Sequence, residues 1–197
     1  MTISQNDLLT AEKTANYYLS RYEMVFQVII TDDNPLLITF GNPIYEIIHI
    51  GVVSTLEGYL HDRLENIILK NRKNRDIYCQ KYNYRRDKVH QIKPSDITAI
   101  INSLDHCYHN IGILQKYFNP FHLEIAPLFY KHNLDGIIDC RNFLCHNPPR
   151  GFIGKQIVHL TISELRTTIN SVKSFISDFE VHCMNEGYDS IFISPDE

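Results

Sequence analysis

Residues 44–71, IYEIIHIGVVSTLEGYLHDRLENIILKN, decide the fold of this 197-residue chain. Their apolar side chains recur every three or four positions for about six turns, which is the pattern of one buried face of a helix. The residues on this face are Ile47, Ile50, Val53, Leu56, Leu60, Leu64 and Ile67. We therefore predict a long core helix from about Ile44 to Asn71, opened by Pro43, in a bundle of helices.

The last helix is marked by its N-terminal cap. Thr161-Ile162-Ser163-Glu164 is a capping box, in which a hydroxyl and a carboxylate bond each other's backbone N–H groups. Ser95 is a further N-cap candidate, for a helix that would run to about Phe118. For the last helix we predict a span from Thr161 to about Met184, with a core face made of Leu165, Ile169, Val172, Ile176 and Phe179.

The N-terminal part leaves two alternatives open. Residues 7–30 predict a helix, but Met24–Ile30 is apolar and partly β-branched, so it fits a strand equally well. A turn signal and a second apolar run follow, so a short β-hairpin or an extended segment near residues 25–40 also fits. We predict one all-α domain of four to five main helices over residues 1–197. It would comprise an N-terminal extension (1–43), a helical core (44–185) and a loose tail (186–197).

The composition predicts a cytoplasmic protein. No apolar run approaches the roughly 18 residues of a membrane span, and the N-terminus lacks the order of a signal peptide. The five cysteines are odd in number and include no Cys-x-x-Cys pair, which favours reduced core thiols. His106 and His109 have ligand-like spacing, but ordinary surface or core-edge histidines are the simpler interpretation. We expect no metal, no cofactor and no membrane partner.

The candidate catalytic residues lie at the end of a helix predicted to start near Leu134. The Pro148-Pro149 pair cannot continue this helix, so it should stop at or just after His146. Asn142 lies one turn before His146 on the same face and can orient its imidazole, and Arg141 flanks that histidine. A histidine in the last turn has its pKa raised by the helix dipole. A guanidinium near such an imidazole can hold a phosphodiester while a proton moves beside it.

Two other segments carry candidate contacts to nucleic acid. Residues 70–93 hold nine Lys or Arg against two Asp, although the whole chain has a net charge of −4. Lys and Arg bind phosphates and tyrosine rings stack on unpaired bases, so this composition fits single-stranded RNA, with a solvated loop as the alternative. Arg150 and Lys155 follow the two prolines and are placed to touch phosphates. The candidates in the basic stretch are Arg72, Lys73, Tyr84, Arg85 and Arg86, with Tyr78 and Tyr82 also set among the charges.

The pattern Arg141-Asn142-x-x-x-His146 near a helix end, preceded by a long helix carrying Glu57, resembles the HEPN superfamily. The resemblance covers residues 44–185. It implies a small all-α domain that in many members is a metal-independent ribonuclease. In such enzymes two signature helices meet across a homodimer and form one composite site. The resemblance also favours a position for Glu57 that faces the signature helix, where it would pair with Arg141 or hold His146.

The preferred interpretation is an endoribonuclease that cleaves single-stranded RNA by attack of the 2′-hydroxyl. His146 would transfer the proton, Arg141 would bind the scissile phosphate, and Asn142 would orient the ring or the phosphate. The resemblance implies a toxin or antiviral-defence effector controlled by an antitoxin or a sensor protein. Some related toxins are silenced through a tyrosine two residues after the histidine; Pro148 stands there, so that route is not expected.

Two other interpretations stay open. The chain could be a HEPN-like module that binds RNA or protein and cleaves nothing. Alternatively the residues could be purely structural, with Arg141 bonded to Glu57, Asn142 acting as a cap and His146 satisfied at the helix end. The ribonuclease hypothesis fails if His146 is enclosed by its own subunit.

Overall fold

The computed structural model describes residues 11–29, 35–83, 110–146 and 160–188, and every element in these residues is helical. This confirms the predicted all-α class, with more short helices than expected. The elements are α1 (Ala11–Ile29), α2 (Pro35–Leu69), α3 (Arg72–Asn83), α5 (Ile111–Phe118), the 3-10 turn η3 (Asn119–Phe121), α6 (Ile125–Lys131), α7 (Leu134–His146) and α8 (Ile162–Asn185).

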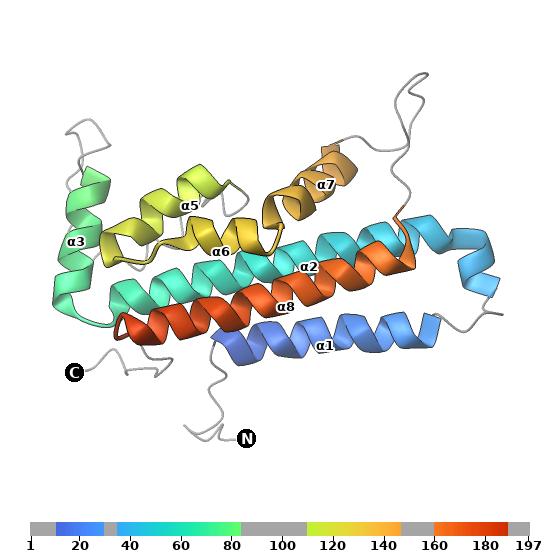
Figure 1. The fold of residues 1–197 in the computed structure, drawn as a ribbon, viewed down its shortest axis with the longest axis horizontal. Helices are drawn as coiled ribbons and strands as arrows, with labels where there is room; N and C mark the ends of the chain where they lie inside the picture. Colours follow the sequence, from blue (N-terminus) through green and yellow to red (C-terminus); the bar gives the residue numbers. More distant parts are fainter. Residues whose placement is uncertain (1–10, 30–34, 84–109, 147–159, 189–197) are drawn as a thin grey trace, which may run out of the picture.

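The long helices α2 and α8 run side by side and form the centre of the fold (Figure 1). α1 packs along one side of this pair, and α6 and α7 pack on the other, while α3 lies at the C-terminal end of α2. Aliphatic and aromatic side chains that are fully removed from water fill most of the core between these helices. Their burial is the main contribution to the stability of a helical bundle. Members of the core include Val52, Leu56, Leu60 and Leu64 from α2 and Leu165, Val172, Phe175 and Phe179 from α8.

The long core helix exists, but it starts earlier than predicted and its N-terminal face is different. α2 begins at Pro35 and contains Pro43 in its interior. Figure 1 shows this end of α2 bent away from its main axis, as an internal proline produces by removing a backbone donor. Ile47, expected in the core, is 67 % exposed, while Tyr45 and Ile48 are buried. This stretch is apolar on two adjacent faces of the helix. Which face is buried depends on the neighbouring helices, and the spacing of apolar residues alone does not reveal it.

The β-hairpin or extended alternative near residues 25–40 was wrong. Residues 25–29 belong to α1 and residues 35–40 to α2. Ala11, Ala15 and Leu19 form the buried face of α1 and belong to the core, so the segment expected as an extension is part of the bundle. The apolar run that suggested a strand continues past this buried face, with Met24 66 % exposed.

The predicted helix from Ser95 to Phe118 is confirmed over residues 111–118, which form α5, but it does not continue through Asn110. Asn110 has an extended backbone (φ −129°, ψ 112°), and its side chain accepts a hydrogen bond from the backbone N–H of Ile113, so α5 starts only at Ile111. An Asn side chain bonded to the local backbone favours a helix start over a helix interior. Residues 95–109, with His106 and His109, lie outside the described residues.

The capping box at the start of α8 is confirmed. The Thr161 hydroxyl accepts from the Glu164 backbone N–H at 3.2 Å, and the Glu164 carboxylate accepts from the Thr161 backbone N–H at 2.8 Å. The Thr161 backbone N–H and the Thr161 hydroxyl both donate to the Glu164 carboxylate, and these two bonds lower its pKa. All five residues of the predicted core face of α8 are buried.

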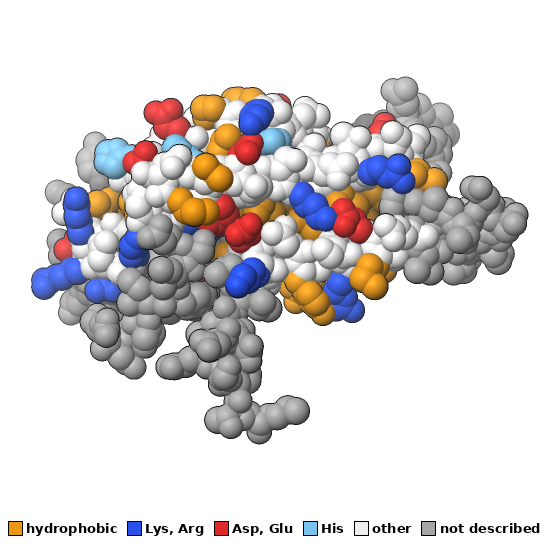
Figure 2. Space-filling model, turned by 60° about the horizontal axis from the view of Figure 1, so that its bottom comes forward, with side chains coloured by type: hydrophobic (Ala, Val, Ile, Leu, Met, Phe, Trp, Pro, Cys, Tyr) orange, Lys and Arg blue, Asp and Glu red, His pale blue; other side chains and the backbone are white. Residues whose placement is uncertain are grey.

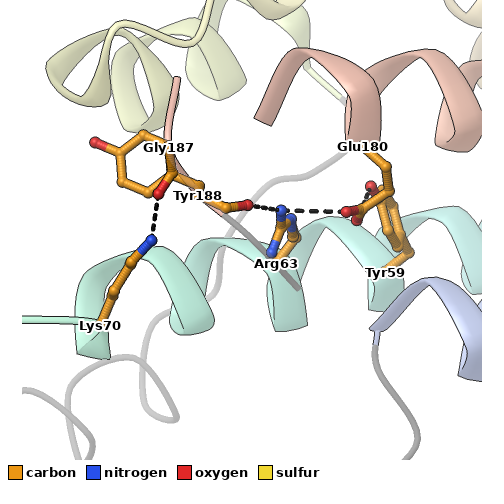
Figure 3. Close-up of polar contacts among 6 residues, drawn as sticks. All are labelled: Tyr59, Arg63, Lys70, Glu180, Gly187 and Tyr188. Atoms are coloured by element: carbon orange, nitrogen blue, oxygen red, sulfur yellow. Dashed lines mark hydrogen bonds and ion pairs between the residues drawn. The ribbon is translucent and has the colours of Figure 1, made fainter. Parts of the chain in front are cut away.

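An ion pair between α2 and α8 lies inside the core (Figure 3). Arg63 Nη2 is 3.1 Å from Glu180 Oε2, and the Tyr59 hydroxyl donates to Glu180 Oε1 at 2.7 Å. Arg63 also donates to the backbone carbonyl of Tyr188, and Lys70 donates to that of Gly187. The start of the tail that was expected to be loose is therefore bonded to α2.

None of the four cysteines in the described residues forms a disulfide, and Cys79 and Cys183 are buried. Burial raises the pKa of the Cys183 thiol to about 12, so it stays protonated. Across the described part of the chain, no helix combines the length and apolar character needed to cross a membrane.

Candidate functional site

The predicted signature helix is α7, which the structure describes from Leu134 to its last residue, His146. Its first half is anchored by Leu134, Ile137 and Ile138, which are buried in the core. Its second half rises toward solvent, with Arg141 partly buried and exposure increasing toward the helix end. The side chain of His146 and the predicted stop at the two prolines lie outside the described structure.

Arg141 is held by two side-chain contacts. Its Nη2 atom lies 3.4 Å from Glu57 Oε2 on α2, and its Nη1 atom donates to Asn142 Oδ1 at 3.0 Å. The side chains of Arg141 and Glu57 are 19 % and 20 % exposed, so water still reaches the pair. The structure thus brings together three of the four predicted catalytic residues. Glu57 faces the signature helix, as the resemblance favoured, while the predicted bond from Asn142 to His146 stays a prediction.

The residue before Arg141 on α7 lies close to negative charge. The thiol of the preceding residue, Cys140, has its pKa raised first by burial and then by the negative charges of Glu164 and Glu46. Glu57 adds a third carboxylate at the guanidinium itself. A phosphate group would therefore meet little net positive charge from this face of one subunit. Strong binding of an anion at Arg141 therefore requires additional positive charge from outside this face.

The backbone of α7 is fixed to the core by a histidine that the sequence analysis did not single out. His49 of α2 is 2 % exposed, and its Nε2 atom lies 3.0 Å from the carbonyl oxygen of Ile137. Its Nδ1 atom lies 3.4 Å from the hydroxyl of Thr168 on α8. Burial lowers the pKa of His49, so it is neutral near pH 7. The sequence feature that could have indicated this residue is a polar side chain between Ile48 and Ile50 in a core helix.

The basic stretch is only partly described. Arg72 and Lys73 are exposed on α3, and Arg72 lies 4.0 Å from Asp76 on the same helix. Lys and Arg side chains gather at the end of the molecule that α3 occupies (Figure 2). This end is roughly 20 Å from Glu57, counting 1.5 Å of rise for each residue of α2 up to Lys70.

The expectation that the tyrosines of this stretch stack on RNA bases is wrong for Tyr78. Tyr78 is 4 % exposed and packs in the core, so it cannot stack on a base. Its place on the inner face of the amphipathic helix α3 accounts for this burial. The side chain of Tyr82 is not described, and the remaining candidates lie outside the described residues: Tyr84, Arg85, Arg86, Arg150 and Lys155.

Within the described residues, one group of side chains has the spacing of metal ligands. The ligand atoms of His61, Asp62 and Glu65 on α2 lie within 4.8 Å of one another. Asp62 is exposed and the other two are partly exposed, so water competes for any ion there.

Comparisons of the chain with protein-family models, with curated proteins and with solved structures gave no match. The resemblance to the HEPN superfamily therefore rests on the residues quoted from the sequence.

Proposed function

We propose that this protein is a metal-independent endoribonuclease that cleaves single-stranded RNA as a homodimer. The observation that supports this best is the pair between Arg141 and Glu57 at 3.4 Å, with Asn142 on the same guanidinium, one turn before His146. It holds a partly exposed arginine in one orientation on the helix that ends at His146. Fixed orientation of the groups that meet a phosphate is a large part of catalysis on phosphodiesters.

Arg141 can bind a phosphate without leaving its two partners. A guanidinium carries five N–H donors. The bonds to Glu57 and Asn142 use two of them and the Nε–H is buried, so a phosphate would use the other two N–H groups on Nη1 and Nη2. The carboxylate of Glu57 then acts as an orienting group. Because it also compensates the charge of Arg141, one subunit offers little net attraction to a polyanion. A second Arg141 and a second His146 across a dimer would supply the missing charge and the second proton-transfer group.

The reaction follows from RNA's own nucleophile. His146 takes the proton of the 2′-hydroxyl, and the 2′-oxygen attacks phosphorus. The 5′-oxygen leaves and takes a proton from His146 of the partner subunit. Arg141 stabilises the negative charge that grows on the non-bridging oxygens. The products are a 2′,3′-cyclic phosphate and a 5′-hydroxyl.

The basic stretch is proposed to guide the RNA and not to react with it. Arg72 and Lys73 lie too far along the molecule to touch a phosphate held by Arg141, so they would bind the strand some distance from the cleaved bond. We propose that such an enzyme acts in the cytoplasm as a toxin or antiviral-defence effector, kept inactive by an antitoxin or released by a sensor protein.

A second candidate is a HEPN-like module that binds RNA or protein and cleaves nothing. The observation that favours it is the same pair: Glu57 compensates the charge of Arg141. A scaffold that had lost cleavage could retain such a pair for stability alone. RNA binding without cleavage would then be the activity of the chain.

The test is an RNA cleavage assay with excess chelator, comparing the wild type with His146→Ala. Cys145→Ala is the matched control, because it alters the adjacent exposed side chain on the same turn of α7. We expect cleavage by the wild type and by Cys145→Ala, and a loss of roughly 10² to 10⁴ in rate for His146→Ala, the range for a general acid–base group. RNA binding without cleavage by all three proteins would favour the module.

A further inference from the structure

We propose that His49 is a positioning residue for Arg141, and that it acts by holding the Ile137 carbonyl of α7 against α2 and α8. The imidazole lies where three helices meet. It belongs to α2, its Nε2 atom bonds the backbone of α7, and its Nδ1 atom faces Thr168 on α8. It does not touch Arg141 and would act on it only through the helix backbone.

The bonded carbonyl is the one that matters for Arg141. In an α-helix the carbonyl of residue 137 accepts the backbone N–H of residue 141, so the same oxygen receives both His49 and the Arg141 amide. A shift or rotation of α7 at Ile137 would carry Arg141 with it. Such a shift would stretch the 3.4 Å contact between Arg141 and Glu57. Misplacement of a catalytic group by about 1 Å can lower a rate by roughly 10².

The chemistry of the site explains why a histidine is suited to it. A carbonyl needs a donor, so Nε2 carries the proton, and in a neutral ring Nδ1 is then an acceptor. The one proton of the Thr168 hydroxyl is donated to the Glu164 carbonyl at 3.0 Å, so the 3.4 Å approach of that hydroxyl to Nδ1 is a polar contact and not a second donated bond. A leucine would fill similar space without the bond to the Ile137 carbonyl. A glutamine could reproduce that bond, with its amide N–H donating.

The expected effect of a His49 substitution on RNA cleavage rests on the proposed function, but its expected effect on the position of α7 does not. The first experiment is therefore hydrogen exchange of backbone amides in the wild type, His49→Leu and His49→Gln. We expect the Arg141 amide to exchange roughly tenfold faster in His49→Leu, the size of one buried hydrogen bond, and near the wild-type rate in His49→Gln. His61→Leu, a change of a partly exposed histidine on the same helix, is the control and should leave Arg141 unchanged.

Unchanged protection of the Arg141 amide in a folded His49→Leu protein would overturn the positioning role. Should that variant fail to fold, nuclear magnetic resonance of the wild-type imidazole gives the second test. A proton on Nε2 supports the proposal, and a proton on Nδ1 alone contradicts it.

RNA assays then separate the two claims. If the protein cleaves RNA, His49→Leu should lower kcat by roughly 10² with little change in KM, and His49→Gln should restore most of it. A cleaving protein whose kcat is unaffected by His49→Leu overturns the positioning role. Faster exchange at Arg141 in a protein that never cleaves RNA would keep the positioning role and overturn the proposed function.

Discussion

Two arginine–glutamate pairs join α2 to a neighbouring helix, and they differ in how far water reaches them. Arg63 and Glu180 lie 3.1 Å apart with side chains 2 % and 3 % exposed. Arg141 and Glu57 lie 3.4 Å apart with side chains 19 % and 20 % exposed. The residue types and the bond are nearly the same, so burial decides what each pair can do.

The buried pair is enclosed by its own network. Tyr59 donates to Glu180, and Arg63 also donates to the carbonyl of Tyr188 (Figure 3). Burial and the charge of Glu180 raise the pKa of Tyr59, so this hydroxyl stays a donor. No substrate can reach a charge held in this way. The buried pair therefore contributes to stability alone, while the pair on α7 is accessible to a ligand.

The largest expected effect is on the buried pair. Glu180→Ala leaves Arg63 charged in the core, and we expect it to lower the free energy of unfolding by about 3–5 kcal/mol. Urea unfolding followed by circular dichroism measures this. The double variant Arg63→Met/Glu180→Leu is the control and should recover most of the loss, because no charge remains buried. A cost of Glu180→Ala below about 1 kcal/mol would remove the distinction between the two pairs.

The next effect separates activity from stability at the exposed pair. Arg141→Ala should lower the rate of RNA cleavage by roughly 10² to 10³, because it removes a donor to the phosphate. The same change should alter the free energy of unfolding by only about 1 kcal/mol or less, since solvent weakens a partly exposed pair. Parallel cleavage and urea measurements test this. A stability loss equal to that of Glu180→Ala would make the exposed pair structural.

A smaller effect concerns His49, which lies on the buried side of α7. Its pKa is lowered in the folded chain by burial, so the unfolded chain binds this proton more readily. Stability is therefore fully present above about pH 6.5, the ordinary pKa of histidine, and is lost as pH falls below it. We expect the wild type to lose more stability between pH 7 and pH 5 than His49→Gln, as measured by urea unfolding. An equal loss in both proteins would contradict the buried neutral histidine.

The smallest expected effect is on the melting temperature, from a methyl group added on the packed side of α2 at Gly51 or on its open side at Gly58. A Cβ added at Gly51 would lie 2.5 Å from the Tyr22 hydroxyl oxygen of α1, whereas one at Gly58 meets nothing within 4 Å. Gly58→Ala should raise the melting temperature, because alanine favours a helix over glycine by about 1 kcal/mol. Gly51→Ala should lower it relative to Gly58→Ala, since Tyr22 has to move. Equal melting temperatures would show that α1 yields at this contact without cost.

The sequence predicted those parts of the fold that depend on local bonds or a clear periodicity. The capping box at Thr161 and the core face of α8 are confirmed. The start of α2 was not predictable, because a proline usually begins a helix and Pro43 lies inside one. The exposure of Ile47 was also hidden, since tertiary contacts select the buried face.

The candidate site was predicted in part. The spacing of Arg141, Asn142 and His146 was readable from the chain, and Glu57 was placed by the resemblance. The bond between Arg141 and Asn142 was not foreseen, because neighbouring residues in a helix point in different directions and only a long side chain curls back. His49 was missed because its role depends on a carbonyl 88 residues away.

The proposed ribonuclease activity is tested most directly by the chemistry of the RNA ends made with excess chelator present. We expect 2′,3′-cyclic phosphate and 5′-hydroxyl ends from the wild type, none of them from Arg141→Ala or His146→Ala, and no cutting where the 2′-hydroxyl is replaced by hydrogen. Ends that carry a 5′-phosphate and appear only with added Mg²⁺, or no cleavage at all by the wild type, would contradict the proposed function.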